Sequence, residues 1–142
     1  MRRPLVAATL LAVLGLAGAA LARPIVYTSD IPRAHPDIQA LWLSEIAPTF
    51  RRTPWIARFD GVTTPVQAID MGGHAMAFGT SCKPHDCGAN VVRVLFDPAG
   101  GRIVAHLRLT GRADRWIGAP NARERACLLA EHDGSHRRPD RC

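Results

Sequence analysis

Residues 90–110, "NVVRVLFDPAGGRIVAHLRLT", contain the part of the sequence that decides the fold. Two apolar runs rich in β-branched residues flank a Pro-Ala-Gly-Gly turn, and this pattern predicts paired strands over 90–97 and 102–110. Both faces of the first run carry apolar side chains. We therefore expect helices to cover both sides of the sheet that these strands build.

A second pair of strands is predicted immediately upstream. The segments 65–71 and 74–81 flank Gly72-Gly73, which is a typical hairpin turn. Before them, residues 52–61 form a connector whose aromatic and aliphatic side chains we expect to pack inward.

Helices are predicted on either side of the strands. Residues 36–47 carry apolar side chains at helical spacing and begin with a proline. A last helix begins near Asn121, where Glu124 three positions on completes an approximate capping box, and Gly134 can end it. Residues 23–35 are expected to be irregular.

The first 22 residues have the features of a secretory signal peptide. Arg2 and Arg3 precede an apolar run over 5–16, and Ala20-Leu21-Ala22 forms an A-x-A cleavage site. The apolar core is shorter than the roughly 20 residues that a membrane span needs, and no other segment is long enough. We expect an exported, periplasmic protein with one domain over 23–142 and no membrane span.

The charge of the chain is modestly basic. The formal net charge is +6, and it falls to +4 once the two arginines of the signal peptide are removed. Aromatic residues are not interleaved with basic ones, and no nucleic-acid motif is present, so nucleic acid is not expected as a partner.

Four cysteines lie in the exported part, namely Cys82, Cys87, Cys127 and Cys142. An even number in an oxidising compartment favours disulfides over metal ligands. Three pairings are possible, and the most local one joins Cys82 to Cys87 and Cys127 to Cys142. Polar neighbours on the last helix place Cys127 on an outward face, where the tail can reach it; a covalent dimer through Cys142 is the rival.

The segment "CKPHDC" (82–87) lies between two predicted strands and holds most of the candidate chemistry. Its C-x4-C spacing differs from the C-x-x-C of redox dithiols. A zinc site built from Cys82, His85 and Cys87 would need reduced thiols and a fourth ligand. No base and orienting group for nucleophilic catalysis are visible. A structural disulfide with a solvated histidine remains the plain alternative. His74 and His106 are interpreted as structural.

This hexapeptide resembles the loop of the inhibitor of vertebrate lysozyme (Ivy) family. Two flanking segments are also similar to that family, "TPWIARFDGVTTPVQAI" (53–69) and "RWIGAPNARERACLLA" (115–130). The resemblance implies an α+β fold in which a central antiparallel sheet of about five strands lies between helices in three α-β-α layers. Four strands are visible in the sequence, and the fifth is implied by the resemblance alone.

The resemblance also implies a function. The protein would be a periplasmic inhibitor of C-type lysozyme that protects peptidoglycan, without enzymatic activity or cofactors. The loop formed by Cys82, Lys83, Pro84, His85, Asp86 and Cys87 would enter the enzyme's cleft. His85 would meet the two catalytic carboxylates, Asp86 would make a secondary contact, and the two cysteines would close the ring.

Two questions stay open at this point. An endogenous lytic transglycosylase is an alternative target, because its cleft also holds a catalytic carboxylate. Both a monomer and a homodimer suit the family. A positive net charge is moreover unfavourable for long-range attraction to a basic lysozyme.

Overall fold

The predicted central hairpin is present in the computed structural model, which describes residues 27–130. Strand β4 (Val91–Phe96) pairs antiparallel with β5 (Ile103–Arg108). All six residues of β4 are buried, as expected for a strand that is covered on both faces.

The other predicted hairpin extends the sheet on one side. Strand β2 (Gln67–Asp70) pairs antiparallel with β3 (Ala75–Cys82), and β3 pairs with β4. The short strand β1 (Val62–Thr63) lies beside the end of β3, and β6 (Arg115–Ile117) lies beside β5. The strand order is β1-β3-β4-β5-β6, with β2 also paired to β3. The sheet is therefore antiparallel throughout, and β6 supplies a strand that was implied by resemblance alone.

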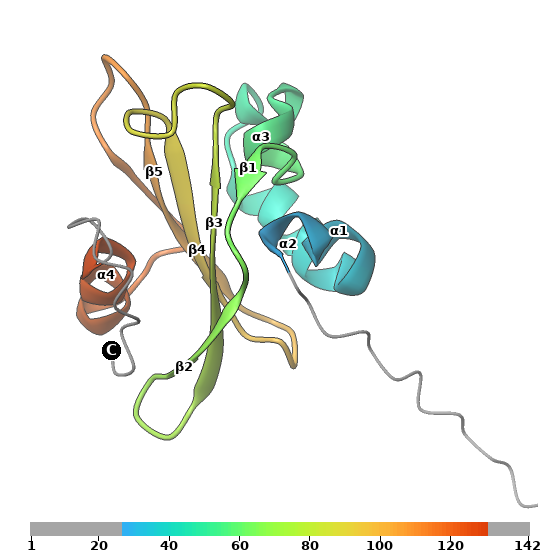
Figure 1. Cartoon of the computed structure of the whole chain (residues 1–142). Coiled ribbons are helices and arrows are strands. Elements are labelled where there is room, and N and C mark those ends of the chain that lie inside the picture. The colour runs from blue at the N-terminus through green and yellow to red at the C-terminus, as the bar shows by residue number, and fades with distance from the viewer. Residues whose placement is uncertain (1–26, 131–142) are drawn as a thin grey trace, which may run out of the picture.

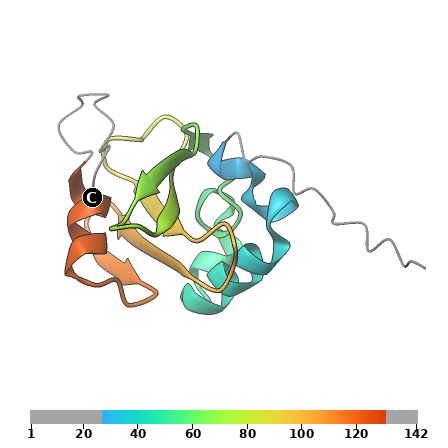
Figure 2. The same cartoon turned by 90° about the horizontal axis from the view of Figure 1, so that it is seen from below.

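Helices cover both faces of this sheet (Figures 1 and 2). On one face lie α1 (Ile31–Ala34), α2 (Pro36–Glu45) and α3 (Pro54–Ala57), with short 3-10 turns η1 (Thr28–Asp30) and η2 (Phe50–Arg52). On the other face lies α4 (Ala122–Leu129). The predicted three-layer α+β architecture is confirmed.

Each face of the sheet has its own apolar core. The larger core joins the N-terminal helices to alternate residues of the central strands and includes Trp42, Phe59, Val94 and Ala105. The smaller core joins α4 to the residues between them, and its members are Ile69, Met76, Phe78, Leu95, Val104, Cys127 and Leu128. This alternation follows from the two-residue period of a strand.

Two predictions about the N-terminal segments need correction or refinement. Residues 23–35 are not all irregular, because η1 and α1 occupy 28–34. Pro32 lies in the first turn of α1, where a missing N–H costs nothing. The connector 52–61 contains α3, and its predicted inward-facing aromatic residues are buried.

The prediction that Cys127 points outward is wrong. Cys127 is only 1% exposed and packs in the smaller core. Glu124, one turn earlier on α4, is also buried. Its burial is tolerated because both of its carboxylate oxygens accept hydrogen bonds from Arg102. Glu124, Cys127 and Leu128 therefore form the face of α4 that contacts the sheet. The sequence prediction failed because the charge of Glu124 made this face look solvent-exposed.

Some predictions fall outside the part of the chain that the structure describes. These are the signal peptide over 1–22, the helix stop at Gly134 and the partner Cys142. Cys127 itself is disulfide-bonded. Within residues 27–130, none of the helices has the length and apolar character needed to span a membrane.

Candidate functional site

The candidate hexapeptide forms a small covalent ring at one end of the sheet. Strand β3 ends at Cys82, and a disulfide joins Cys82 to Cys87 across a Cα–Cα distance of 4.9 Å. Figure 1 shows this loop at the same end of the sheet as α3 and the loop that follows β5. All six candidate residues are therefore brought together, whereas Cys127 lies on α4, away from them.

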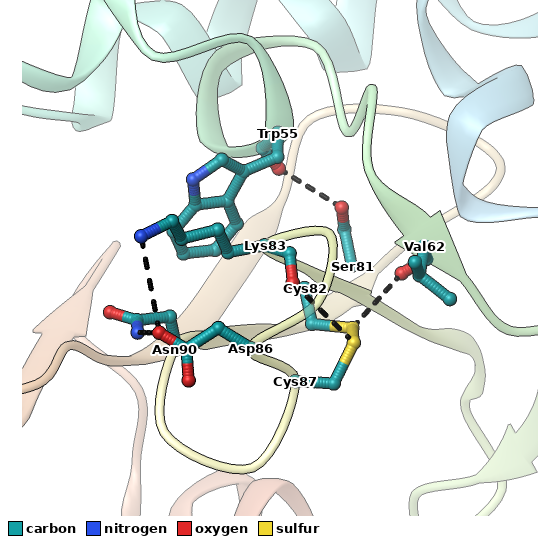
Figure 3. The surroundings of a disulfide bond; sticks show 8 residues. All are labelled: Trp55, Val62, Ser81, Cys82, Lys83, Asp86, Cys87 and Asn90. Atoms are coloured by element: carbon teal, nitrogen blue, oxygen red, sulfur yellow. Dashed lines mark hydrogen bonds and ion pairs between the residues drawn. A yellow bond between two sulfur atoms is a disulfide. The ribbon is translucent and has the colours of Figure 1, made fainter.

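The two cysteines have different surroundings (Figure 3). Cys82 is 6% exposed, and its sulfur lies 3.4 Å from the carbonyl oxygen of Val62 on β1. Cys87 is exposed. Close packing behind Cys82 requires a glycine, because a Cβ on Gly61 would lie 2.3 Å from the Cys82 carbonyl oxygen. One side of the ring is thus fixed to the sheet and the other faces solvent.

Asn90 closes the base of the loop. Its backbone carbonyl accepts from the Lys83 N–H at 3.0 Å, and its own N–H donates to the Asp86 carbonyl at 3.1 Å. Its side-chain Nδ2 donates to the Asp86 carboxylate and, at 2.9 Å, to the Thr110 hydroxyl. Its Oδ1 accepts from the Thr110 N–H at 3.1 Å. The loop is therefore tied to the segment after β5 as well as to its own strands.

The tip of the ring is presented to solvent. Lys83, Pro84 and His85 are exposed, and the Lys83 ammonium lies 3.9 Å from the Asp86 carboxylate. His85 has a φ of 65°, in the left-handed region that non-glycine residues rarely adopt. Such strained residues persist only where their surroundings hold them, and they cluster at binding sites. The ring and the Asn90 network supply that restraint.

The ring is suited to binding another molecule through hydrogen bonds and not to holding a metal ion through its sulfurs. The two sulfurs are bonded to one another, so neither is a thiolate that could act as a metal ligand. Among the described residues, no group of three or more histidine, cysteine and acidic side chains is arranged to hold a metal ion. An exposed imidazole at the tip of a pre-formed loop can donate or accept hydrogen bonds with little ordering on binding.

A cavity of about 370 Å³ lies beside the base of the ring. It is lined by Lys83 and Asn90 of the loop, by Phe50 and Trp55 of η2 and α3, and by Arg112 after β5. Sequence reasoning missed this feature. Trp55 is a core residue, as predicted, but it also lines this cavity, and nothing local indicated that residues 50–56 and 109–112 would meet at the ring.

His106 is a buried sheet residue and not part of this site. Its ring is 1% exposed, and its Nε2 lies 2.9 Å from the Asp114 carboxylate. Burial lowers the pKa of His106, against the opposing hydrogen bond and charge of Asp114. The charges of Arg93 and Arg108 lower this pKa further. The structural interpretation of His106 is confirmed by this environment.

A family model and a named relative both indicate the same family. The family model described as "Inhibitor of vertebrate lysozyme (Ivy)" matches residues 51–124, which include the ring, Trp55 and Asn90. The chain is similar to a protein of Pseudomonas aeruginosa named "Inhibitor of vertebrate lysozyme", with 26% identity over 83% of this chain and 89% of that protein. It is also similar to an uncharacterized protein of Yersinia pestis, with 26% identity over 84% and 87% of the two chains.

Proposed function

The chain belongs to the inhibitor of vertebrate lysozyme (Ivy) family, and on that premise we propose that it is an exported inhibitor of C-type lysozyme. The predicted signal peptide over 1–22 would deliver it to the periplasm, where peptidoglycan needs protection. The domain over 23–142 would act by binding, without catalysis of its own.

We propose that the ring acts as a plug in the enzyme's active-site cleft. The observation that carries this proposal is the exposed His85 at the tip of a loop whose base is fixed by a disulfide and by Asn90. Lysozyme is the type case of a retaining glycosidase, whose two catalytic carboxyl groups lie about 5 Å apart. A protonated imidazole carries one donor on each side and can serve both carboxyl groups at once.

The rigidity of the ring favours tight binding. Association costs free energy for each loop that must be ordered, and a loop that is already ordered avoids part of that cost. Each charge-assisted hydrogen bond from an imidazolium to a carboxylate contributes roughly 1.5–3 kcal/mol. These contributions come from short-range contacts, so they do not require long-range attraction between two basic proteins.

The first prediction concerns His85→Ala. We expect the inhibition constant on a C-type lysozyme to rise at least about tenfold, because the loss of one such hydrogen bond corresponds to about one factor of ten or more. The fold should be unchanged, because His85 is exposed. Inhibition constants from lysis of peptidoglycan suspensions measure the effect.

His74→Ala is the matched control. His74 is also an exposed histidine, but it lies at the β2–β3 turn, where it pairs with Asp97 at 3.2 Å. Its inhibition constant should stay within about twofold of the unmodified protein, the range expected for a surface change away from the interface. Equal constants for His85→Ala and the unmodified protein would falsify the role of the ring. A panel of C-, G- and I-type lysozymes and a lytic transglycosylase identifies the target.

A further inference from the structure

The cavity beside the ring has the size of a small-molecule site. Its volume is about 370 Å³, within the roughly 300–1,000 Å³ that is typical of ligand pockets. Three segments far apart in sequence build it, namely residues 49–56, the ring base and residues 109–112. The cavity lies next to the base of the ring, and His85 at the exposed tip is not among its lining residues.

The polar lining of the cavity is dominated by hydrogen-bond donors. Lys83 and Arg112 contribute positive charge, and none of the lining residues within 27–130 is acidic. The ring itself carries one carboxylate, that of Asp86. It lies 3.9 Å from the Lys83 ammonium and already accepts a hydrogen bond from the Asn90 side chain. Lys83 is the only lysine in a chain that otherwise uses arginine for positive charge.

The indole of Trp55 adds a neutral donor. In Figure 3 its nitrogen and the Lys83 ammonium point to the same side of the ring base. No acceptor for this N–H is found among residues 27–130, whereas the Trp42 indole donates to the Ile56 carbonyl at 2.8 Å. The Trp55 N–H is therefore available to a ligand, because an indole nitrogen acts only as a donor.

The rest of the lining is divided between carbon and hydroxyl groups. Phe50, Ile56 and Leu109 provide apolar surface, and Thr49 and Thr53 provide hydroxyls that can both donate and accept. A matching ligand has an apolar face, several hydroxyls and one anionic group. A pyranose ring that carries a carboxylate combines these three properties, and a carboxylate makes strong charge-assisted bonds to Lys and Arg.

We propose that this cavity binds an acidic sugar, that is, one pyranose bearing a carboxylate. Two sources offer this chemistry: the lactyl-bearing amino sugar of peptidoglycan and the uronic acids of surface polysaccharides. The inference can be tested apart from lysozyme inhibition, because Trp55 and Arg112 lie outside the ring, although Lys83 belongs to both the cavity and the ring.

The test is a titration of the protein followed through its tryptophan indole N–H resonances by NMR. The sequence has three tryptophans, and the Trp55 resonance is assigned with Trp55→Phe. The ligands are N-acetylmuramic acid and glucuronic acid, with neutral N-acetylglucosamine and inorganic phosphate as comparisons. We expect a saturable shift of the Trp55 resonance with at least one acid, at a dissociation constant at least tenfold below that of N-acetylglucosamine. The Trp42 resonance should not move.

A pair of charge variants locates the binding. Arg112→Gln should weaken acid binding at least tenfold, whereas Arg58→Gln, an exposed arginine outside the cavity, should leave it within twofold. An unchanged Trp42 resonance establishes that each variant is folded. A stronger response to the muramic acid assigns the site to cell-wall fragments, and a stronger response to the uronic acid assigns it to surface polysaccharide.

Three results would overturn the proposal. They are the absence of saturable shifts with both acids, an equal response to N-acetylglucosamine, and a phosphate response as strong as that of the acids. Lysozyme inhibition measured on the same samples stays informative in each case, because loss of sugar binding leaves the His85 contacts intact.

Discussion

Asn90 connects the ring to the rest of the molecule through a buried side chain. Its amide uses both donor hydrogens and its oxygen within the described structure, on Asp86 and on Thr110. The position of His85, three residues after Cys82, depends on this anchor, because the strained backbone at the tip relaxes if the base moves.

The second prediction is that Asn90→Ala destabilises the protein by about 1–3 kcal/mol, because the buried Asn90 side chain loses its hydrogen bonds to Asp86 and Thr110. Inhibition by the folded variant should weaken several-fold, since the loop must then be ordered on binding. Urea unfolding and the inhibition constant measure the two effects. A variant with unchanged stability contradicts the anchoring role.

At this scale, the identity of the ring residues was predictable but their geometry was not. "CKPHDC" was recognised from its letters, and the disulfide between Cys82 and Cys87 is present. His85 adopts a left-handed conformation with a φ of 65°, and a tendency of histidine toward this region is too weak to predict it at one position. Asn90 is held by Thr110, which lies 20 residues further along the chain. Sequence spacing does not indicate that these two residues form a hydrogen bond.

Among the elements, α4 shows how a charged residue can hide the buried face of a helix. Glu124 is 4% exposed, accepts from Arg102 at 2.7 and 2.9 Å, and also receives the N–H of Asn121 in the capping box. Arg102 lowers the pKa of Glu124 through its hydrogen bonds and charge. The cap was predicted from sequence, but the ion pair between Arg102 and Glu124 was not, because Arg102 lies in a different part of the chain.

The third prediction concerns Glu124→Gln. This change removes the ion pair but keeps an oxygen that can accept at the cap, so we expect a loss of about 1–2 kcal/mol in the free energy of unfolding. Arg102 is 45% exposed and can be solvated when its partner is neutral, which limits the cost. Urea denaturation measures it. Because α4 lies away from the ring (Figure 1), lysozyme inhibition should not change, and a loss of inhibition would count against this separation.

For the whole molecule, two groups make stability depend on pH in the same direction. The pKa of Glu124 is lowered in the folded state, so its contribution is present above its ordinary value of 4.5 and is lost as the pH falls through the folded value. The pKa of His106 is lowered from 6.5. The unfolded chain then binds more protons at this residue, and its contribution is lost as the pH falls below 6.5.

The fourth prediction is therefore a two-step loss of stability on acidification. The free energy of unfolding should begin to fall below about pH 6.5 because of His106, and it should fall again below about pH 4.5 because of Glu124. Urea midpoints between about pH 3 and pH 8 measure the profile. In His106→Gln the first step should disappear while the second remains. A profile of unchanged shape in that variant rules out His106 as the cause.

The fifth prediction separates the ring from the fold. Replacing both Cys82 and Cys87 by alanine should cost about 2 kcal/mol in a chain-entropy model of so short a loop, while the sheet stays intact. Inhibition should fall more strongly than stability, because the open loop must be ordered when it binds. Circular dichroism, urea unfolding and inhibition constants are compared. Full inhibition by the open variant would show that closure of the ring is dispensable.

The three-layer architecture was the most predictable property of the whole chain. Apolar side chains on both faces of 90–97 indicated helices on both sides, and the structure has them. The short elements β1, β6, η1 and α1 lack the length to give a periodic signal, and their places depend on tertiary contacts. Thr28, for example, packs where a Cβ on Gly79 would lie 2.3 Å from its hydroxyl oxygen.

The position of the ring at the closed end of the β3–β4 hairpin has a mechanical consequence. A partner that pulls on the ring applies force along β3 and β4 together, parallel to the strands and perpendicular to the hydrogen bonds that join them to β2 and β5. Those bonds are then loaded in shear, all at once, and are not opened one after another. The sheet should therefore resist a force applied through the ring more strongly than a force that peels one strand from its neighbour.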